Sequence, residues 1–375
     1  MMASRPAQRL GQFATHLAGR PHARAVATAG AKLPEIYFGT MTFGWSQASS
    51  TVDDNTSAEM LKRYGALGGV QVDTARIYSG GKTEDILGNI LGCSELAGRQ
   101  WVLGTKAHPS QEGGLSGPGI RSQLKESLAA MKVKDVDILY LHQPDPDHDL
   151  SESLECVQQL IGEGLIRRFG MSNYSAVEVD RCCTMCKDRG WTTPSVYQGL
   201  YNPLNRLVEE ELLPVLRKHG VSFVAYNPLA AGLLTGKHTD SNNVLPGRFK
   251  ENQNYLPRFY TKPNFEALAG IREACAEAGI SMVSASYAWL LQHSALSAEK
   301  GDGLLIGASS LVQLDENLSA CFSPPQLPES LVSAFDAAWP LVSQSGDVFP
   351  YWRSYSKDQP GRENLHPGAS YAAKK

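Results

Sequence analysis

From residue 35 onward, short apolar segments alternate with longer segments in which apolar residues recur every three or four positions. This spacing, as in Ile120 and Leu124, predicts amphipathic helices, and Gly220 and Gly279 stand where two of these helices should end. The short apolar segments have the length of buried strands. The expected strands are Glu35–Thr40, Val70–Ala75, Trp101–Lys106, Val136–His142, Arg168–Asn173, Ser195–Tyr201, Val221–Asn227 and Leu304–Ala308.

The alternation of strand and helix predicts an α/β protein in which helices cover a parallel sheet. Eight such units in one chain favour a closed (β/α)₈ TIM barrel. The alternative is an open, doubly wound sheet, which would carry G-x-G-x-x-G after its first strand if it bound a dinucleotide. Here the first strand runs into "GTMTFGWS" instead. We therefore expect one barrel domain over residues 35–353.

The two ends of the chain are interpreted as tails outside this domain. Residues 1–34 are rich in Ala and Arg and contain no Asp or Glu. This composition is typical of a mitochondrial transit peptide, and a disordered tail is the alternative. A cytoplasmic or mitochondrial location is expected on this basis. Residues 354–375 are interpreted as a C-terminal tail.

The longest irregular stretch, His238–Pro263, follows the seventh expected strand. A structureless segment of this length in a compact domain is usually a functional lid or a disordered loop. Its Arg and Tyr residues are unusual for a simple linker, and we interpret it as a lid loop.

Composition argues against several classes of partner. The formal net charge of −3 provides no basic field for nucleic acid, and no apolar run approaches the length of a membrane span. The seven Cys residues suggest no disulfide framework. A C-x-x-C lies at Cys183–Cys186, but no second pair stands at zinc spacing, so no metal site is predicted.

The letters "GGKT" at 80–83 look like the end of a phosphate-binding P-loop. The full motif requires a glycine five residues before Gly81, and that position is Arg76. The letters are better explained as a turn into a helix over Thr83–Leu91.

Three ionisable residues stand where neighbouring strands end: Asp73, Lys106 and His142, with Tyr78 just beyond the first of them. Active sites of such barrels gather at these strand ends. Reduction of a carbonyl needs a proton donor, and a free Tyr, with a pKa of about 10, is a weak one. An ammonium held by Asp73 would lower that pKa, while an imidazole could polarise the carbonyl. The hydride itself must come from a cofactor.

The motifs "DTARIYSGG", "GTKAHP", "VDILYLHQPD" and "GMSNYSAVEV", in this order, resemble the aldo-keto reductase superfamily. "PSVYQGLYNPLNR", "YNPLAAGLLTGK" and "GASSLVQLDENL" are most similar to its branch of aflatoxin-aldehyde and succinic-semialdehyde reductases. The resemblance covers residues 35–353. It implies a (β/α)₈ barrel that binds NADPH and reduces aldehydes, including carboxy-aldehydes and dialdehydes, in a detoxifying role.

The resemblance also implies individual roles. Tyr78 would be the proton donor, Lys106 would lower its pKa, Asp73 would support Lys106, and His142 would orient the substrate. The nicotinamide end of the cofactor would be bound by Asp73, Ser172, Asn173, Gln198 and Tyr226. The pyrophosphate and the adenosine phosphate would be bound by Asn227, Pro228, Leu229, Gly232, Leu234, Gly236, Lys237, Arg248, Gly307, Ser309, Ser310, Gln313, Glu316 and Asn317.

In the same branch, arginines from the lid and the C-terminus reach acidic substrates. Arg258 and Arg353 stand at the matching positions, and an Arg can bind a carboxylate through two hydrogen bonds. The alternative is that both are surface residues. A homodimer is expected from the resemblance alone.

Two other functions remain open. Potassium-channel β-subunits share this barrel and these four residues, so an NADPH-binding regulatory subunit with little turnover is the main alternative. A lyase or isomerase that uses Lys106 as a Schiff base is the other, although Asp73 beside the amine would keep it protonated.

Overall fold

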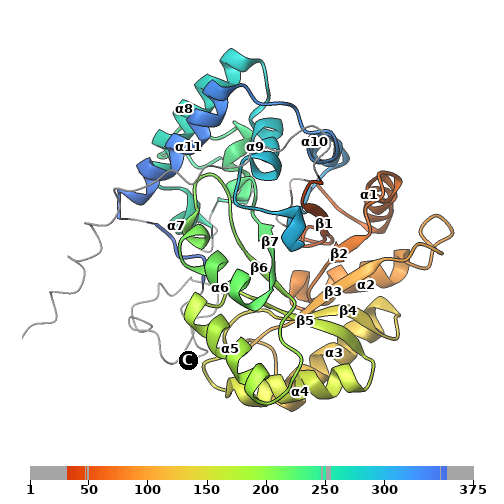
Figure 1. The fold of residues 1–375 in the computed structure, drawn as a ribbon. Helices are drawn as coiled ribbons and strands as arrows, with labels where there is room; N and C mark the ends of the chain where they lie inside the picture. The colour runs from red at the N-terminus through yellow and green to blue at the C-terminus, as the bar shows by residue number, and fades with distance from the viewer. Residues whose placement is uncertain are drawn as a thin grey trace, which may run out of the picture.

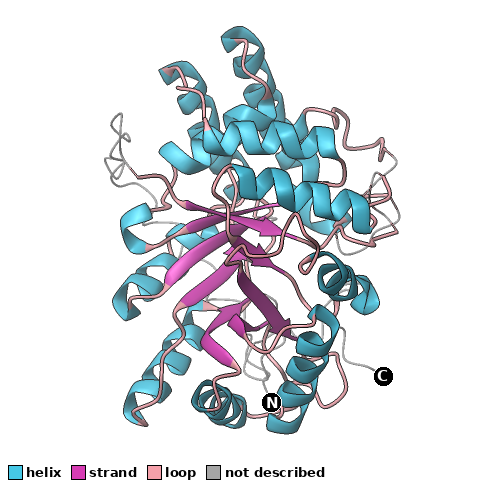
Figure 2. Ribbon diagram, turned by 90° about the vertical axis from the view of Figure 1, so that its right-hand side faces the viewer, coloured by secondary structure: helices cyan, strands magenta, loops and turns pink. Residues whose placement is uncertain are grey.

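The computed structural model describes residues 32–46, 48, 50–245, 248–250, 255–346 and 348–352. Eight parallel strands close into one barrel in chain order, and helices surround it (Figures 1 and 2). The predicted (β/α)₈ barrel is therefore confirmed. The strands are β1 Glu35–Gly39, β2 Gln71–Asp73, β3 Val102–Ala107, β4 Val136–Leu141, β5 Ile166–Ser172, β6 Val196–Leu200, β7 Ser222–Tyr226 and β8 Gly303–Ile306.

Each expected strand is present, with ends shifted by up to a few residues. The shift is informative at β2, which stops at Asp73 although the apolar run extends to Ala75. The carbonyl of Thr74 accepts a hydrogen bond from Lys106 Nζ at 2.7 Å. Just beyond the end of β2, a side chain from β3 therefore binds the backbone, while the N–H of Thr74 still donates to the carbonyl of Gly104 at 2.8 Å.

The helices include two that end at the predicted glycines and one that begins with a capping box. Ser175 forms a capping box with Glu178 at the start of α5, and Gly220 and Gly279 adopt the left-handed conformation after α6 and α8. The helices are α1 Asp54–Ala66, α2 Lys82–Ile90, α3 Gly117–Met131, α4 Leu150–Gly162, α5 Ala176–Asp188, α6 Leu212–His219, α7 Leu256–Phe259, α8 Lys262–Ala278, α9 Met282–Gln292, α10 Leu311–Phe322 and α11 Glu329–Ser343.

The segment after β7 is more structured than a lid loop. It begins with the 3-10 segment η3, Ala230–Thr235, and its last third contains α7 and the start of α8. The interpretation of His238–Pro263 as wholly irregular was therefore wrong at its C-terminal end. Helix α8 packs against α11, which follows the last barrel helix (Figure 1). Residues 1–31 and 353–375 lie outside the described residues, and these ranges contain all but the last three residues of the predicted N-terminal tail, the whole predicted C-terminal tail, and Arg353.

Two large rings fill the inside of the barrel, and glycines on neighbouring strands make room for them. Tyr37 and Tyr140 are both buried there. A Cβ added at Gly303 would lie 2.5 Å from the Tyr37 ring, and one at Gly170 would lie 2.7 Å from the Tyr140 ring. These glycines are required by packing rather than by backbone conformation.

We expect Gly170→Ala to lower the free energy of unfolding by about 1–3 kcal/mol, because the added methyl group overpacks the barrel interior. Urea denaturation of the wild type and the variant measures this loss. The matched control is Gly162→Ala at the end of α4, where an added Cβ meets nothing within 4 Å. Equal midpoints for Gly170→Ala and wild type would show that the Tyr140 ring and the Val196 carbonyl, which also lies 2.7 Å from the added Cβ, both move without cost.

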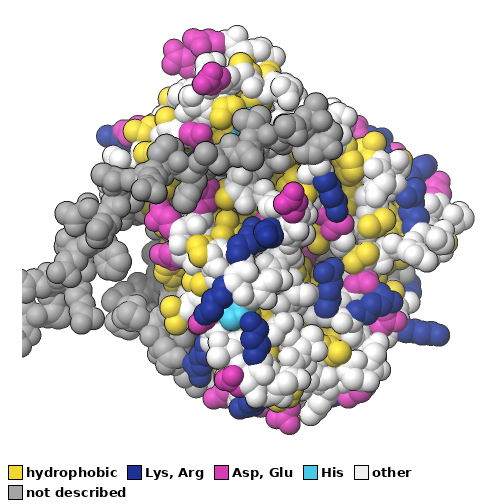
Figure 3. All heavy atoms as spheres, in the orientation of Figure 1, with side chains coloured by type: hydrophobic (Ala, Val, Ile, Leu, Met, Phe, Trp, Pro, Cys, Tyr) yellow, Lys and Arg dark blue, Asp and Glu magenta, His cyan; other side chains and the backbone are white. Residues whose placement is uncertain are grey.

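Charged side chains of both signs are interspersed on the face seen in Figure 3. Within the described residues, no helix is long and apolar enough to cross a membrane.

Candidate active site

A buried ion pair lies at the C-terminal end of the barrel. Lys106 Nζ lies 2.5 Å from Asp73 Oδ1, and both side chains are almost wholly excluded from solvent. The second oxygen of Asp73 accepts a hydrogen bond from Gln198 Nε2 at 2.8 Å. The ammonium also donates to the carbonyl of Thr74, so both members of the pair are held by further polar contacts.

Burial acts on both charges of this pair. It raises the pKa of Asp73 and lowers the pKa of Lys106, because each loses water that would stabilise its charged form. The attraction between the two groups opposes both shifts. Each group therefore relies on its partner to offset part of the cost of burying its charge.

Tyr78 and His142 lie next to this pair and are only half-buried. Lys106 Nζ lies 4.8 Å from the centre of the Tyr78 ring. The rings of Tyr78 and His142 meet edge to face with centres 5.9 Å apart. The four predicted catalytic residues thus come together, with a buried pair of charges next to a half-buried phenol and a half-buried imidazole.

The glycines of "GGKT" shape the turn that carries Tyr78. The 3-10 segment η1, Tyr78–Gly81, contains three successive residues with positive φ: Ser79 at 51°, Gly80 at 64° and Gly81 at 99°. The guanidinium of Arg76 donates to the carbonyl of Gly81 at 3.0 Å and closes the turn. A Cβ at Gly81 would lie 2.6 Å from that guanidinium. The turn then leads into α2, as predicted.

Polar side chains from β5, β6 and β7 extend the site from His142. Asn173 Nδ2 donates to the His142 carbonyl at 2.9 Å and to Ser172 Oγ at 3.0 Å. The Tyr226 hydroxyl donates to Asn173 Oδ1 at 2.7 Å. Three of the residues predicted to bind nicotinamide therefore form one hydrogen-bonded chain, and Gln198 joins the site through Asp73.

The predicted pyrophosphate segment runs from Asn227 through η3. At Gly232 φ is +116°, and a Cβ there would meet nothing within 4 Å, so its backbone faces open space. The side chain of Leu234 is fully buried in the apolar core, so a contact of this residue with a phosphate would have to come from its backbone. The remaining members of this set are Pro228, which is buried, Leu229 and Gly236, which are half-buried, and Lys237, which is exposed.

The predicted adenosine-phosphate residues gather at the start of α10. Ser310 caps the helix, and Gln313 Oε1 accepts hydrogen bonds from the backbone and side chain of Ser309. Asn317 Nδ2 donates to the carbonyl of Gly307 at 3.1 Å. Glu316 is exposed and contacts Ser281 on the neighbouring helix. A phosphate fits such a helix start, and a dinucleotide fits the combined set of amides, open glycine backbone and helix N-terminus.

The predicted binding residues Arg248 and Arg258 contact different aromatic rings. The guanidinium of Arg248 stacks on Trp45 at 5.3 Å and on Tyr255 at 5.5 Å, which joins the lid to the loop after β1. Arg258 is buried, with its guanidinium 4.3 Å from the Phe349 ring centre. Arg353 lies outside the described residues.

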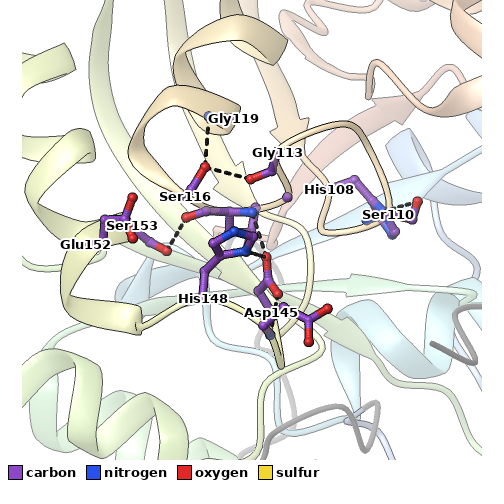
Figure 4. Close-up of polar contacts among 12 residues, drawn as sticks. His108, Ser110, Gly113, Ser116, Gly119, Asp145, His148, Glu152 and Ser153 are labelled. Carbon is purple, nitrogen blue, oxygen red and sulfur yellow. Dashed lines mark hydrogen bonds and ion pairs between the residues drawn. The ribbon is translucent and has the colours of Figure 1, made fainter. Parts of the chain in front are cut away.

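Two loops at the site are tied together by Asp145, as Figure 4 shows. Asp145 lies in the loop after β4 and accepts hydrogen bonds from the backbone N–H of Leu115 at 2.6 Å and from His148. Ser153 on α4 donates to the carbonyl of Leu115 at 2.6 Å. The loop that follows His142 is therefore fixed to the loop that follows β3.

Sequence reasoning missed His108 at this site. Its ring meets that of His142 with centres 4.9 Å apart. The signal was available, because His108 stands two residues after Lys106 and side chains two apart on a strand share a face.

Comparison with known proteins agrees with this geometry. The model of the Aldo/keto reductase family matches residues 35–340. The chain belongs to the aldo/keto reductase family and is an oxidoreductase by class.

Individual relatives are 34–40% identical to this chain. The chain is 39% identical over 360 residues to aflatoxin B1 aldehyde reductase member 2 of Mus musculus, covering 91% of this chain and 95% of that protein. It is 40% identical over 323 residues to aldo-keto reductase family 7 member A3 of Homo sapiens, covering 83% and 95%. It is 34% identical over 328 residues to oxidoreductase sirO of Leptosphaeria maculans, covering 84% and 97%. The predicted resemblance is thereby confirmed, whereas the roles of single residues stay predictions.

Proposed function

We propose that this protein is an NADPH-dependent reductase that converts aldehydes into alcohols. The observation that carries the proposal is the position of the Lys106 ammonium, which contacts the Asp73 carboxylate and lies against the Tyr78 ring. The names of the most similar relatives, which are aldehyde reductases, support the choice of substrate class.

The reaction adds a hydride to the carbonyl carbon and a proton to its oxygen. NADPH supplies the hydride when bound. Tyr78 gives its hydroxyl proton to the oxygen, because the nearby ammonium stabilises the phenolate that remains. Asp73 keeps Lys106 charged and in place, and His142 donates a hydrogen bond that orients and polarises the carbonyl.

The cofactor would be held by residues that the strand ends bring together. Ser172, Asn173 and Gln198 offer amide and hydroxyl groups for a nicotinamide carboxamide, and the Tyr226 ring offers a stacking surface. The backbone at Gly232 and the start of α10 suit phosphates. Lys237 and Arg248 are the cations that would favour the 2′-phosphate of NADPH over NADH.

A panel of aldehydes, assayed with NADPH and NADH in parallel, tests this function. We expect consumption of NADPH with 4-nitrobenzaldehyde and with succinic semialdehyde, and a lower kcat/KM with NADH. Tight binding of NADPH without turnover of any aldehyde would instead favour a regulatory subunit. Trapping of an aldehyde on Lys106 by borohydride would favour the Schiff-base alternative.

We further propose that Arg258 helps to bind carboxy-aldehydes. Arg258→Ala should raise the KM for succinic semialdehyde about 10-fold or more and change that for 4-nitrobenzaldehyde much less, because only the former carries a carboxylate. Steady-state kinetics with the two substrates measures the difference. Arg272→Ala is a matched control, since Arg272 Nη2 contacts the His238 carbonyl on the lid. Equal effects on both substrates would remove the carboxylate argument.

The predicted homodimer and the division of the chain at residues 35 and 353 also stay proposals. Sedimentation of the purified protein tests the first. N-terminal sequencing of the protein isolated from its cells shows whether residues 1–34 are removed.

A further inference from the structure

The register between β3 and β4 predicts that His108 lies next to His142. Lys106 pairs with Tyr140 and Ala107 with Leu141, and the backbone N–H of His142 donates to the carbonyl of Ala107. Continuing this register by one residue places His108 beside His142. Because alternate residues share a face, His108 points to the same side of β3 as Lys106.

The contact between the two imidazoles is close and perpendicular. Their ring centres are 4.9 Å apart with an interplanar angle of 88°. The Tyr78 ring meets His142 at 78° with centres 5.9 Å apart. His108 is fully buried, whereas Tyr78 and His142 are half-buried. The rings of Tyr78 and His108 therefore both limit the orientation of the His142 ring. Of these two, only the His108 ring is fully buried.

The protonation state of His108 is fixed by its neighbours. The backbone N–H of Ser110 donates to His108 Nδ1 at 3.0 Å, and Ser110 Oγ lies 2.8 Å from the same nitrogen (Figure 4). A backbone amide can only donate, so Nδ1 must be an acceptor. The ring is then neutral and carries its proton on Nε2. The backbone N–H of His108 is held in turn by Gln123 Oε1 at 2.7 Å.

We propose that His108 is a positioning residue for His142. Its buried ring, with its centre 4.9 Å from that of His142, holds the His142 imidazole at the angle needed to donate a hydrogen bond to the substrate carbonyl. The tie between the two loops through Asp145 keeps the histidines at this spacing. The inference rests on the proposed function, because it assigns His142 the role of orienting an aldehyde.

Two substitutions separate positioning from simple packing. His108→Asn keeps an oxygen that can accept the Ser110 N–H but removes the ring, whereas His108→Phe keeps a ring of similar size. We expect His108→Asn to lower kcat/KM for 4-nitrobenzaldehyde about 10- to 100-fold, as a small misplacement of a catalytic group does. His108→Phe should stay within about fivefold of the wild type, and the NADPH Kd of both should change less than about twofold.

Nitrogen NMR of the protein labelled in its histidines gives a readout that does not need turnover. We expect one neutral imidazole with its proton on Nε2 that disappears in both His108 variants. The His142 signals, assigned with His142→Asn, should shift in His108→Asn and move little in His108→Phe.

The outcomes distinguish this inference from the proposed function. If the wild type reduces no aldehyde, the proposed function is wrong. The NMR measurement then still tests whether His108 positions the His142 ring. Three results would each overturn the positioning role of His108. They are a wild-type kcat/KM in His108→Asn, an equal loss of kcat/KM in both variants, and His142 signals that do not shift in His108→Asn.

Discussion

Tyr78→Phe is expected to abolish most aldehyde reduction while leaving NADPH binding unchanged. Loss of a general acid lowers kcat by about 10²- to 10⁴-fold. The phenyl ring preserves the surface against which Lys106 Nζ lies, at 4.8 Å from the ring centre, and the edge-to-face contact with His142. The variant therefore removes the proton donor and keeps these two ring contacts. Steady-state turnover with 4-nitrobenzaldehyde and the quenching of protein fluorescence by NADPH measure the two effects.

A second Tyr→Phe variant provides the control for this result. The Tyr197 hydroxyl on β6 donates to the carbonyl of Tyr174 at 2.6 Å and is buried in the core around the barrel. Tyr197→Phe should lower the free energy of unfolding by about 1 kcal/mol and leave kcat near the wild-type value. Near wild-type turnover in Tyr78→Phe would show that the proton comes from another group.

The barrel and the location of its site could be predicted from the sequence, because both depend on local patterns. Apolar runs separated by helical periodicity specify the strands, and the strand ends of such a fold meet on one face. These patterns are enough to predict that Asp73 and Lys106 lie near each other. Their direct contact at 2.5 Å, and the burial that shifts the pKa of each, depend on packing across the barrel and have no local signal.

The backbone after β7 shows why other parts of the site could not be predicted. Asn227, Ala230 and Ala231 all have positive φ, at 53°, 47° and 58°. Ala is uncommon in this conformation, so the residue types give no warning of it. Turns of this kind are imposed by the surrounding structure and are concentrated at functional sites. Leu234 lies in the same segment, and its side chain is buried in the core.

Lys106→Met is expected to reduce both activity and stability, for two different reasons. Without the ammonium, Tyr78 loses the charge that favours its phenolate. Asp73 also becomes a buried carboxylate without a cation, and breaking a buried ion pair in this way costs about 3–5 kcal/mol. Turnover with 4-nitrobenzaldehyde and urea denaturation at neutral pH measure the two losses.

The stability loss of this variant should depend on pH in a defined direction. Burial raises the pKa of Asp73, and Lys106 opposes that shift in the wild type. In Lys106→Met the folded-state pKa of Asp73 therefore rises further above its unfolded value. A carboxyl shifted in this direction favours folding at low pH, and that contribution is lost as pH rises through the folded-state pKa. The deficit relative to wild type should thus be smallest in acid and grow toward neutral pH.

The double variant Asp73→Asn/Lys106→Met separates the two roles of the pair. It leaves no unpaired charge, and the oxygen of the introduced amide can still accept the hydrogen bond from Gln198 that Asp73 accepts at 2.8 Å. Its stability should return to within about 1–2 kcal/mol of the wild type, because replacing a whole buried pair is often nearly neutral. Its activity should stay lost, since the ammonium beside Tyr78 is still absent. A stable double variant that reduces aldehydes at the wild-type rate would show that the pair serves only the fold. A double variant as unstable as Lys106→Met would show instead that the stability loss does not come from the unpaired carboxylate.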